Sequence, residues 1–126
     1  RSAGLNPEDV DYISAHGTGT QLNDVSEPRA IKAAFGAHAR KVAISSTKSM
    51  TGHMMGATGA LEAIFCALAI VENVAPPTAH YQTPAPECAL AYVPNEARRM
   101  SVEIAISNAF GFGGHNAVLA FRKFRD

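Results

Sequence analysis

Two histidines and a lysine stand where they could stabilise developing negative charge, and a glutamate stands where it could hold the lysine. His16 opens a loop of glycines and threonines, and His53 ends residues 46–53, which also contain Lys48. A neutral imidazole can donate a hydrogen bond to a carbonyl oxygen as that oxygen gains negative charge. The N-terminus of the helix predicted just after His53 favours this neutral form. We expect Glu27 to be the carboxylate that holds the Lys48 ammonium.

The histidines do not form a metal-binding pattern. None of the five has the HxH, HxxxH or HExxH spacing, so the sequence indicates no metal site. His38 and His80 lie in polar or proline-rich segments and are interpreted as surface or core residues. The unusual loops around His16 and His53 favour a functional role for those two.

A third unusual loop spans residues 108–116 and is rich in glycine. Its glycines are Gly111, Gly113 and Gly114. The loop lacks a P-loop lysine and joins two predicted strands rather than opening a helix, which argues against phosphate binding. Its glycines are predicted to let backbone N–H groups approach a substrate.

Strands and helices are predicted to alternate, which is typical of α/β layers in one compact unit. We expect strands near 10–15, 42–46, 91–93, 102–107 and 117–121. Helices are expected near 26–35, because a proline at position 28 fits a first turn, and over 56–74. The second helix is apolar on nearly every face, which indicates burial. The three loops above follow strands, and ligand sites gather at the carboxyl ends of strands.

Composition limits the classes of function. The 126 residues fit one domain, with 47% hydrophobic and 17% charged residues against about 25% charged in typical domains. This low charge, and a start at Arg1 without Met, favour a part of a longer protein whose other part covers some of this surface. The net charge of zero argues against nucleic-acid or anionic-membrane binding. No apolar stretch approaching the roughly 20 residues of a membrane span is expected.

The two cysteines, Cys66 and Cys88, form no CxxC pair. Their number fits a reducing compartment such as the cytoplasm. Cys66 lies in an apolar run and is interpreted as a buried small hydrophobic residue.

Three segments together resemble the C-terminal motifs of the β-ketoacyl-acyl-carrier-protein synthases. They read Ala-His-Gly-Thr-Gly-Thr at 15–20, Ser-Thr-Lys-Ser-Met-Thr-Gly-His at 46–53, and Asn-Ala-Phe-Gly-Phe-Gly-Gly at 108–114. The sequence is most similar to the type II condensing enzymes of bacterial fatty-acid synthesis (synthases I and II). The similarity runs from about Leu5 to Phe124, and three ordered motifs are far more specific than one.

The resemblance implies the thiolase fold, an αβαβα arrangement of two similar halves. Residues 1–126 would form the C-terminal half, with a mixed sheet and a buried helix. The implied reaction is a decarboxylative Claisen condensation of malonyl-acyl carrier protein with an acyl-enzyme thioester, which gives a 3-oxoacyl product two carbons longer. Substrates would arrive on the phosphopantetheine arm of acyl carrier protein, with no cofactor bound covalently to this chain. A homodimer is implied for the intact enzyme.

By position in these motifs, His16 and His53 match the two active-site histidines of the family. The resemblance implies that they hydrogen-bond the malonyl thioester carbonyl and stabilise the enolate. Lys48 matches the active-site lysine, and Glu27 matches the acidic residue that pairs with it.

The resemblance also implies roles at the substrate channel. Thr18 and Thr20 match threonines that contact the pantetheine arm. Phe112 matches a gating phenylalanine whose backbone N–H contributes to the oxyanion hole, with Phe110 packed nearby.

The nucleophilic cysteine of the family lies in the N-terminal half, in a context that neither Cys66 nor Cys88 shares. We therefore expect the isolated chain to be inactive. The alternatives are a polyketide ketosynthase, a non-catalytic chain-length-factor-type partner, and a free-standing binding module. Gly19 resembles the residue that polyketide ketosynthases have at this position. Intact His16, Lys48 and His53 argue against the chain-length factor.

Overall fold

A computed structural model describes residues 2–83 and 90–125 and contains a mixed four-stranded sheet. The strands are β1 (Tyr12–Ser14), β2 (Ala43–Ser45), β5 (Ile104–Phe110) and β6 (Asn116–Arg122). Their order is β2-β1-β5-β6, with β1 parallel to both β2 and β5 and with β6 antiparallel to β5. The predicted α/β class and mixed sheet are confirmed.

Helix α1 (Gln21–Phe35) begins earlier than the sequence predicted. Thr20 is its N-cap, and the Thr20 hydroxyl accepts a hydrogen bond from the backbone N–H of Asn23 at 3.3 Å. The prediction of a start near residue 26 was wrong because Pro28 lies inside the helix. A proline there removes one helical hydrogen bond and costs about 3 kcal/mol. Its ring is buried, so packing offsets part of this cost.

The helix predicted over 56–74 is present as the 3-10 turn η3 (Met55–Ala57) followed by α3 (Thr58–Glu72). A short helix that was not predicted, α2 (Lys48–Thr51), lies before them. Three further 3-10 turns in the described residues are η1 (Pro7–Asp9), η2 (Gly36–Arg40) and η5 (Phe112–Gly114). Asn73 adopts the left-handed conformation, φ 53°, that ends many helices. The helix therefore stops two residues before its predicted end.

A small two-stranded sheet was not predicted. It pairs β3 (Val74–Ala75) with β4 (Arg98–Arg99) in antiparallel orientation. Strands of two residues carry no detectable alternation of apolar and polar residues, which explains the omission. The predicted edge strand near 91–93 is present only as a parallel bridge between Tyr92 and Ile44 of β2.

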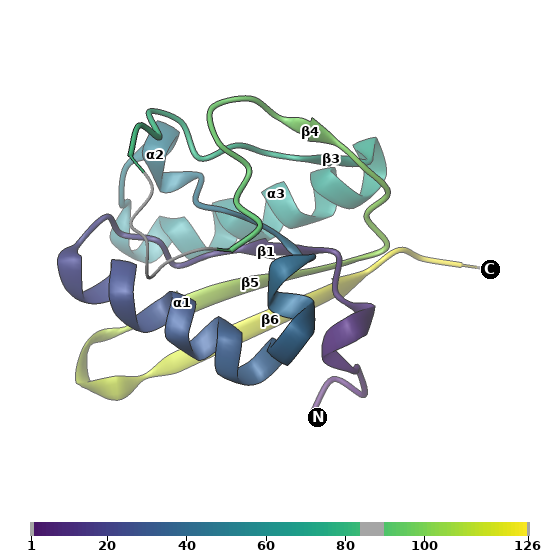
Figure 1. The fold of residues 1–126 in the computed structure, drawn as a ribbon, viewed down its shortest axis with the longest axis horizontal. Helices are drawn as coiled ribbons and strands as arrows, with labels where there is room; N and C mark the ends of the chain where they lie inside the picture. Colours follow the sequence, from purple (N-terminus) through teal and green to yellow (C-terminus); the bar gives the residue numbers. More distant parts are fainter. Residues whose placement is uncertain (1, 84–89, 126) are drawn as a thin grey trace.

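The two faces of the large sheet carry different side chains. Ile13, Ile44 and Ile106 pack in the core cluster on the α1 side. The residues directly before them, Tyr12, Ala43 and Ala105, belong to the cluster with α3. Successive strand residues point to opposite faces, so the isoleucines meet α1, whereas a tyrosine and two alanines meet α3. Helices α1 and α3 thus lie on opposite faces of the sheet (Figure 1).

Helix α3 is buried on one face only, so the prediction of complete burial was wrong. Thr58, Glu62, Cys66, Ala69 and Ile70 are its buried residues. On the other side Ile64, Leu68 and Val71 are 54, 49 and 69% exposed. A single sheet can cover only one side of a helix, and no second layer covers the rest within the described residues.

The 18 residues Met55–Glu72 are long and apolar enough to cross a membrane by length and composition alone, with a mean hydropathy of 1.6. The sequence-based expectation of no such stretch was therefore too strict. This is weak evidence for a membrane span, because core helices of soluble proteins meet the same criteria. In this chain the helix packs one face on the sheet.

The loops that follow β1, β2 and β5 lie at one end of the sheet, at the left of Figure 1, and the C-terminus lies at the other end. This follows from the parallel direction of the three strands. The predicted convergence of the three unusual loops is confirmed at this level of the fold.

Cys66 is fully buried, as predicted, and its Sγ donates to the Ile106 carbonyl oxygen at 3.7 Å. Burial raises the pKa of the Cys66 thiol to about 12. Cys88 lies outside the described residues. Cys66 therefore has neither the access nor the thiolate character of a nucleophile.

We predict that iodoacetamide modifies Cys66 very slowly in the folded chain. With a pKa near 12, only about one thiol in ten thousand is ionised at a pH of about 8, and burial blocks approach as well. Peptide mapping by mass spectrometry would read Cys66 separately from Cys88. Labelling in concentrated urea is the control, and an equal rate in the folded chain would contradict the prediction.

Candidate active site

His16 and His53 meet at the loop end of the sheet. Their ring centroids are 5.7 Å apart, and the ring planes are nearly perpendicular at 86°. His16 follows β1, whereas His53 lies between α2 and α3. The Phe110 ring, at the end of β5, lies 5.4 Å from the His16 ring. The sequence-predicted pair therefore converges, with Phe110 packed beside it as expected.

The surroundings of His53 determine which ring nitrogen carries hydrogen. Its Nδ1 accepts the backbone N–H of Met55 at 3.1 Å, and the Thr58 hydroxyl lies 3.4 Å from the same nitrogen. We assign the hydrogen of the neutral ring to Nε2, because Nδ1 is occupied as an acceptor. His53 can thus offer one N–H to a substrate oxygen.

Glu27 does not hold Lys48, which corrects the sequence-based expectation. Its Oε1 accepts the backbone N–H of His16 at 2.8 Å, and its Oε2 accepts that of Gly17 at 2.9 Å. The side-chain amides of Asn23 and Asn108 donate to the same carboxylate at 3.1 and 3.2 Å. Four donors satisfy the buried carboxylate, so Glu27 fixes the backbone of the His16 loop.

Lys48 instead forms a buried ion pair with Glu62 of α3. The two side chains are 4 and 3% exposed. Sequence reasoning missed Glu62, although a signal was present. A glutamate inside an apolar helix is rarely buried without a partner. The nearest lysine or arginine in the sequence, Lys48, lies 14 residues earlier.

Electrostatics in the site favour neutral His16. Burial lowers the pKa of the His16 imidazole, and the nearby Lys48 ammonium lowers it further, against the opposing effect of Glu27. Burial raises the pKa of the Glu62 carboxyl, and Lys48 opposes that rise. The ion pair thus places a positive charge where it disfavours protonation of His16.

The remaining predicted residues lie in more open positions. The hydroxyls of Thr18 and Thr20 are 3.1 Å apart, and Thr20 also caps α1. Phe112 is 90% exposed in the loop between β5 and β6. Its predicted gating role, and the contacts of the threonines with pantetheine, stay predictions.

The glycine-rich loop is closed by a hydrogen bond from the Gly111 N–H to the His115 carbonyl oxygen at 2.6 Å. Gly113 and Gly114 have φ angles of 73° and 80°, which favour glycine. This explains why glycines occur there. Delivery of backbone N–H groups to a substrate stays a prediction.

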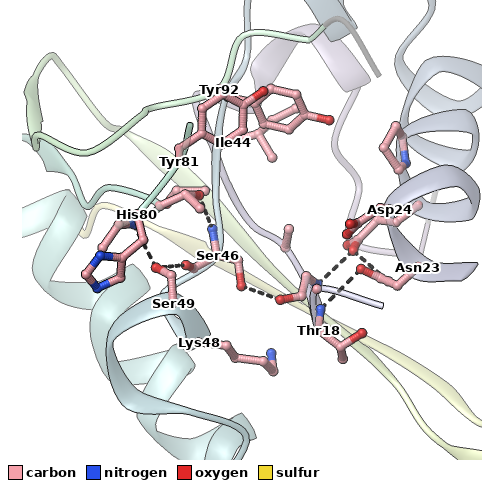
Figure 2. Close-up of a pocket in the computed structure, with 18 of the residues that line it drawn as sticks. Thr18, Asn23, Asp24, Ile44, Ser46, Lys48, Ser49, His80, Tyr81 and Tyr92 are labelled. Carbon is pink, nitrogen blue, oxygen red and sulfur yellow. Dashed lines mark hydrogen bonds between the residues drawn. The ribbon is translucent and has the colours of Figure 1, made fainter. Parts of the chain in front are cut away.

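A cavity of about 460 Å³ adjoins the site (Figure 2). It lies between α1, the loops after β1 and β2, and residues 78–83. Its lining includes Gly17, Ser46 and Lys48 but neither histidine of the pair. Across residues 2–83 and 90–125, no group of three or more histidine, cysteine or acidic side chains could hold a metal ion.

We predict that Glu62→Ala lowers the free energy of unfolding by about 3–5 kcal/mol, because it leaves the Lys48 ammonium buried without a counter-charge. The double variant Glu62→Leu with Lys48→Met should recover most of this loss, since it removes both charges. Urea unfolding measures each value.

Glu72→Ala is the matched control for the ion pair, since Glu72 is exposed on the same helix. It should change stability by no more than about 0.5 kcal/mol. A Glu62→Ala variant as stable as Glu72→Ala would contradict a structural role of the pair.

Known proteins share the sequence pattern and the fold of this chain. The family model "Beta-ketoacyl synthase, C-terminal domain" matches residues 1–82. The chain is 54% identical over 125 residues to 3-oxoacyl-[acyl-carrier-protein] synthase 2 of Synechocystis sp., covering 99% of this chain and 30% of that protein. It is 56% identical over 122 residues to the synthase 2 of Staphylococcus aureus, covering 97 and 30%.

A solved structure gives the same result for the fold. It contains a type II polyketide acyl-carrier protein in complex with its ketosynthase bound to the hexaketide. The likeness has a TM-score of 0.94 and 40% sequence identity, and it covers 98% of this chain and 30% of that one. The predicted thiolase-like fold is confirmed, and the chain spans about 30% of the length of the relatives it matches. The chain belongs to the β-ketoacyl synthase family, in its C-terminal domain.

Proposed function

We propose that this chain supplies the histidine–histidine–lysine part of the active site of a 3-oxoacyl-acyl-carrier-protein synthase. The observation that carries the proposal is the convergence of the His16 and His53 rings, 5.7 Å apart, at the carboxyl end of the sheet. The 54% identity to a synthase 2 supports fatty-acid elongation as the reaction.

In the proposed reaction the two imidazoles donate hydrogen bonds to the thioester carbonyl oxygen of a malonyl group. The bond between the malonyl carboxylate and its neighbouring carbon breaks, and the electron pair forms an enolate while carbon dioxide leaves. Preorganised donors stabilise that oxygen as its charge develops. The enolate carbon then attacks an acyl thioester on a cysteine, whose thiolate is released, and the product is two carbons longer.

The cysteine would come from a part of the protein beyond this chain. Cys66 is buried and has a raised pKa, so it does not serve. We infer that an N-terminal part of the protein, corresponding to the length of the relatives that this chain does not span, brings the nucleophile and covers the exposed face of α3. The isolated chain would then be inactive, and acyl carrier protein would deliver both substrates to a cytoplasmic homodimer.

The test uses a chimera in which this chain replaces the corresponding C-terminal part of the Synechocystis synthase. The chimera should release carbon dioxide from malonyl-acyl carrier protein and form 3-oxoacyl product, whereas the isolated chain should not. His16→Ala and His53→Ala should each slow carbon dioxide release about 100- to 1,000-fold, because each removes an oxyanion donor.

His80→Ala provides the control, since His80 is exposed and takes no part in the proposed chemistry. It should leave the rate within about twofold. Wild-type rates in the His16→Ala and His53→Ala chimeras would remove the basis of the proposed function.

Carbon dioxide release should also depend on pH in a defined direction. Because burial and Lys48 lower the pKa of His16, its neutral donor form should persist below the ordinary value of about 6.5. Activity should then fall only as pH drops through this lowered pKa.

The same shift affects stability. Between the lowered pKa and the ordinary value, the unfolded chain binds more protons at His16, so its contribution to stability is lost as pH falls. NMR titration of the His16 ring, assigned by its loss in His16→Ala, would measure the pKa. A value above 6.5 would contradict the prediction.

A further inference from the structure

Gly17, the residue after His16, is held on both sides of its backbone. Its N–H donates to Glu27 Oε2 at 2.9 Å, and its carbonyl oxygen accepts the Ser46 hydroxyl at 2.7 Å. Gly17 also has a φ of +45°, and a Cβ there would lie 2.4 Å from the Ser46 Cβ. Ser46 is therefore in direct contact with the peptide that carries His16.

Ser46 is in turn fixed by the segment that follows β3. Its N–H donates to Thr78 Oγ1 at 2.9 Å, and its carbonyl oxygen accepts the Ser49 hydroxyl at 2.8 Å. The Ser49 oxygen also accepts the Ala79 N–H at 2.8 Å. Ser46 is 8% exposed, and Figure 2 shows it at the centre of these hydrogen bonds. Its hydroxyl therefore has little freedom to leave Gly17.

We propose that the Ser46 hydroxyl is a positioning group for His16. It links the loop after β1, which contains His16, to the segment after β2, which contains Lys48. Ser46 touches no reacting atom in this scheme. Glu27 fixes the N–H side of the Gly17 peptide, and Ser46 fixes the carbonyl side, so that the His16 ring is held opposite His53. The proposal rests on the function proposed above.

The effect on catalysis follows from the sensitivity of rates to geometry. A displacement of about 1 Å of a catalytic group can reduce a rate about 100-fold. Loss of one of the two anchors should move His16 less than that. Replacement of Ser46 by alanine keeps the small side chain against Gly17 but leaves the Gly17 carbonyl oxygen without its donor.

The experiment compares Ser46→Ala with wild type in the Synechocystis chimera. The kcat for carbon dioxide release should fall about tenfold, while KM for malonyl-acyl carrier protein stays within about twofold. The acid limb of the pH profile should move to higher pH, because a loosened His16 ring is more solvated and its pKa rises toward its ordinary value. An alteration of general stability alone would not shift this limb.

A second variant acts on Ser46 without removing its hydroxyl. Thr78→Val removes the acceptor of the Ser46 N–H and should lower kcat in the same direction by a smaller factor. If Ser46→Ala is unfolded at the assay temperature, the kcat of Thr78→Val tests the positioning role of Ser46 instead. Ser26→Ala, a loss of hydroxyl at an exposed position of α1, should leave kcat unchanged.

A readout in the chain itself separates this proposal from the proposed function. The His16 ring signals and their titration should shift in Ser46→Ala relative to wild type, whether or not the chimera is active. An inactive wild-type chimera would count against the proposed function alone. Unchanged His16 titration together with unchanged kcat in both variants would overturn the positioning role of Ser46.

Discussion

The buried carboxylate of Glu27 is the contact on which the geometry of the site depends. It lies on α1 and accepts the N–H groups of His16 and Gly17 after β1, and Asn108 of β5 donates to it as well. A buried carboxylate is stable only when donors satisfy it. Helix α1 and strands β1 and β5 must therefore keep their relative positions for the Glu27 carboxylate to keep its hydrogen bonds. The backbone of His16 is fixed as a consequence.

The other face of the sheet is organised around a second buried charge. Helix α3 packs on this face in a cluster with Tyr12, Ala43 and Ala105, and its Glu62 forms an ion pair with Lys48. A buried ion pair contributes little net stability compared with apolar packing. The pair also has an effect on the site, because the Lys48 ammonium adds to the effect of burial in lowering the pKa of His16.

The sequence predicted the two histidines because His16 opens an unusual loop after one short apolar segment and His53 ends the unusual loop after the next. Parallel strands bring such loops to one edge, so their convergence follows from strand direction. The partner of Lys48 was predicted wrongly because Glu27 and Glu62 are both carboxylates in helices near the lysine. Which one reaches it depends on the side of the sheet on which each helix packs, and α1 and α3 pack on opposite sides.

The limits of helices were also set by contacts that a linear pattern does not encode. Thr20 caps α1 and moves its start seven residues ahead of Pro28, a position at which proline is usually placed in a first turn. The burial of α3 was overestimated because apolar composition shows that a helix can be covered, not that this part of the chain covers it. Ile64, Leu68 and Val71 on the other side of α3 stay exposed among the described residues.

Four residues of the site, all between positions 16 and 62, act on one another in sequence. Glu62 balances Lys48, and the Lys48 ammonium disfavours protonation of His16, whose backbone is in turn fixed by Glu27. None of these contacts requires the nucleophile proposed to come from another part of the protein. Under the proposed function, the hydrogen-bond donors for an enolate would lie within this chain, and the rest of the protein would have to place an acyl thioester within their reach.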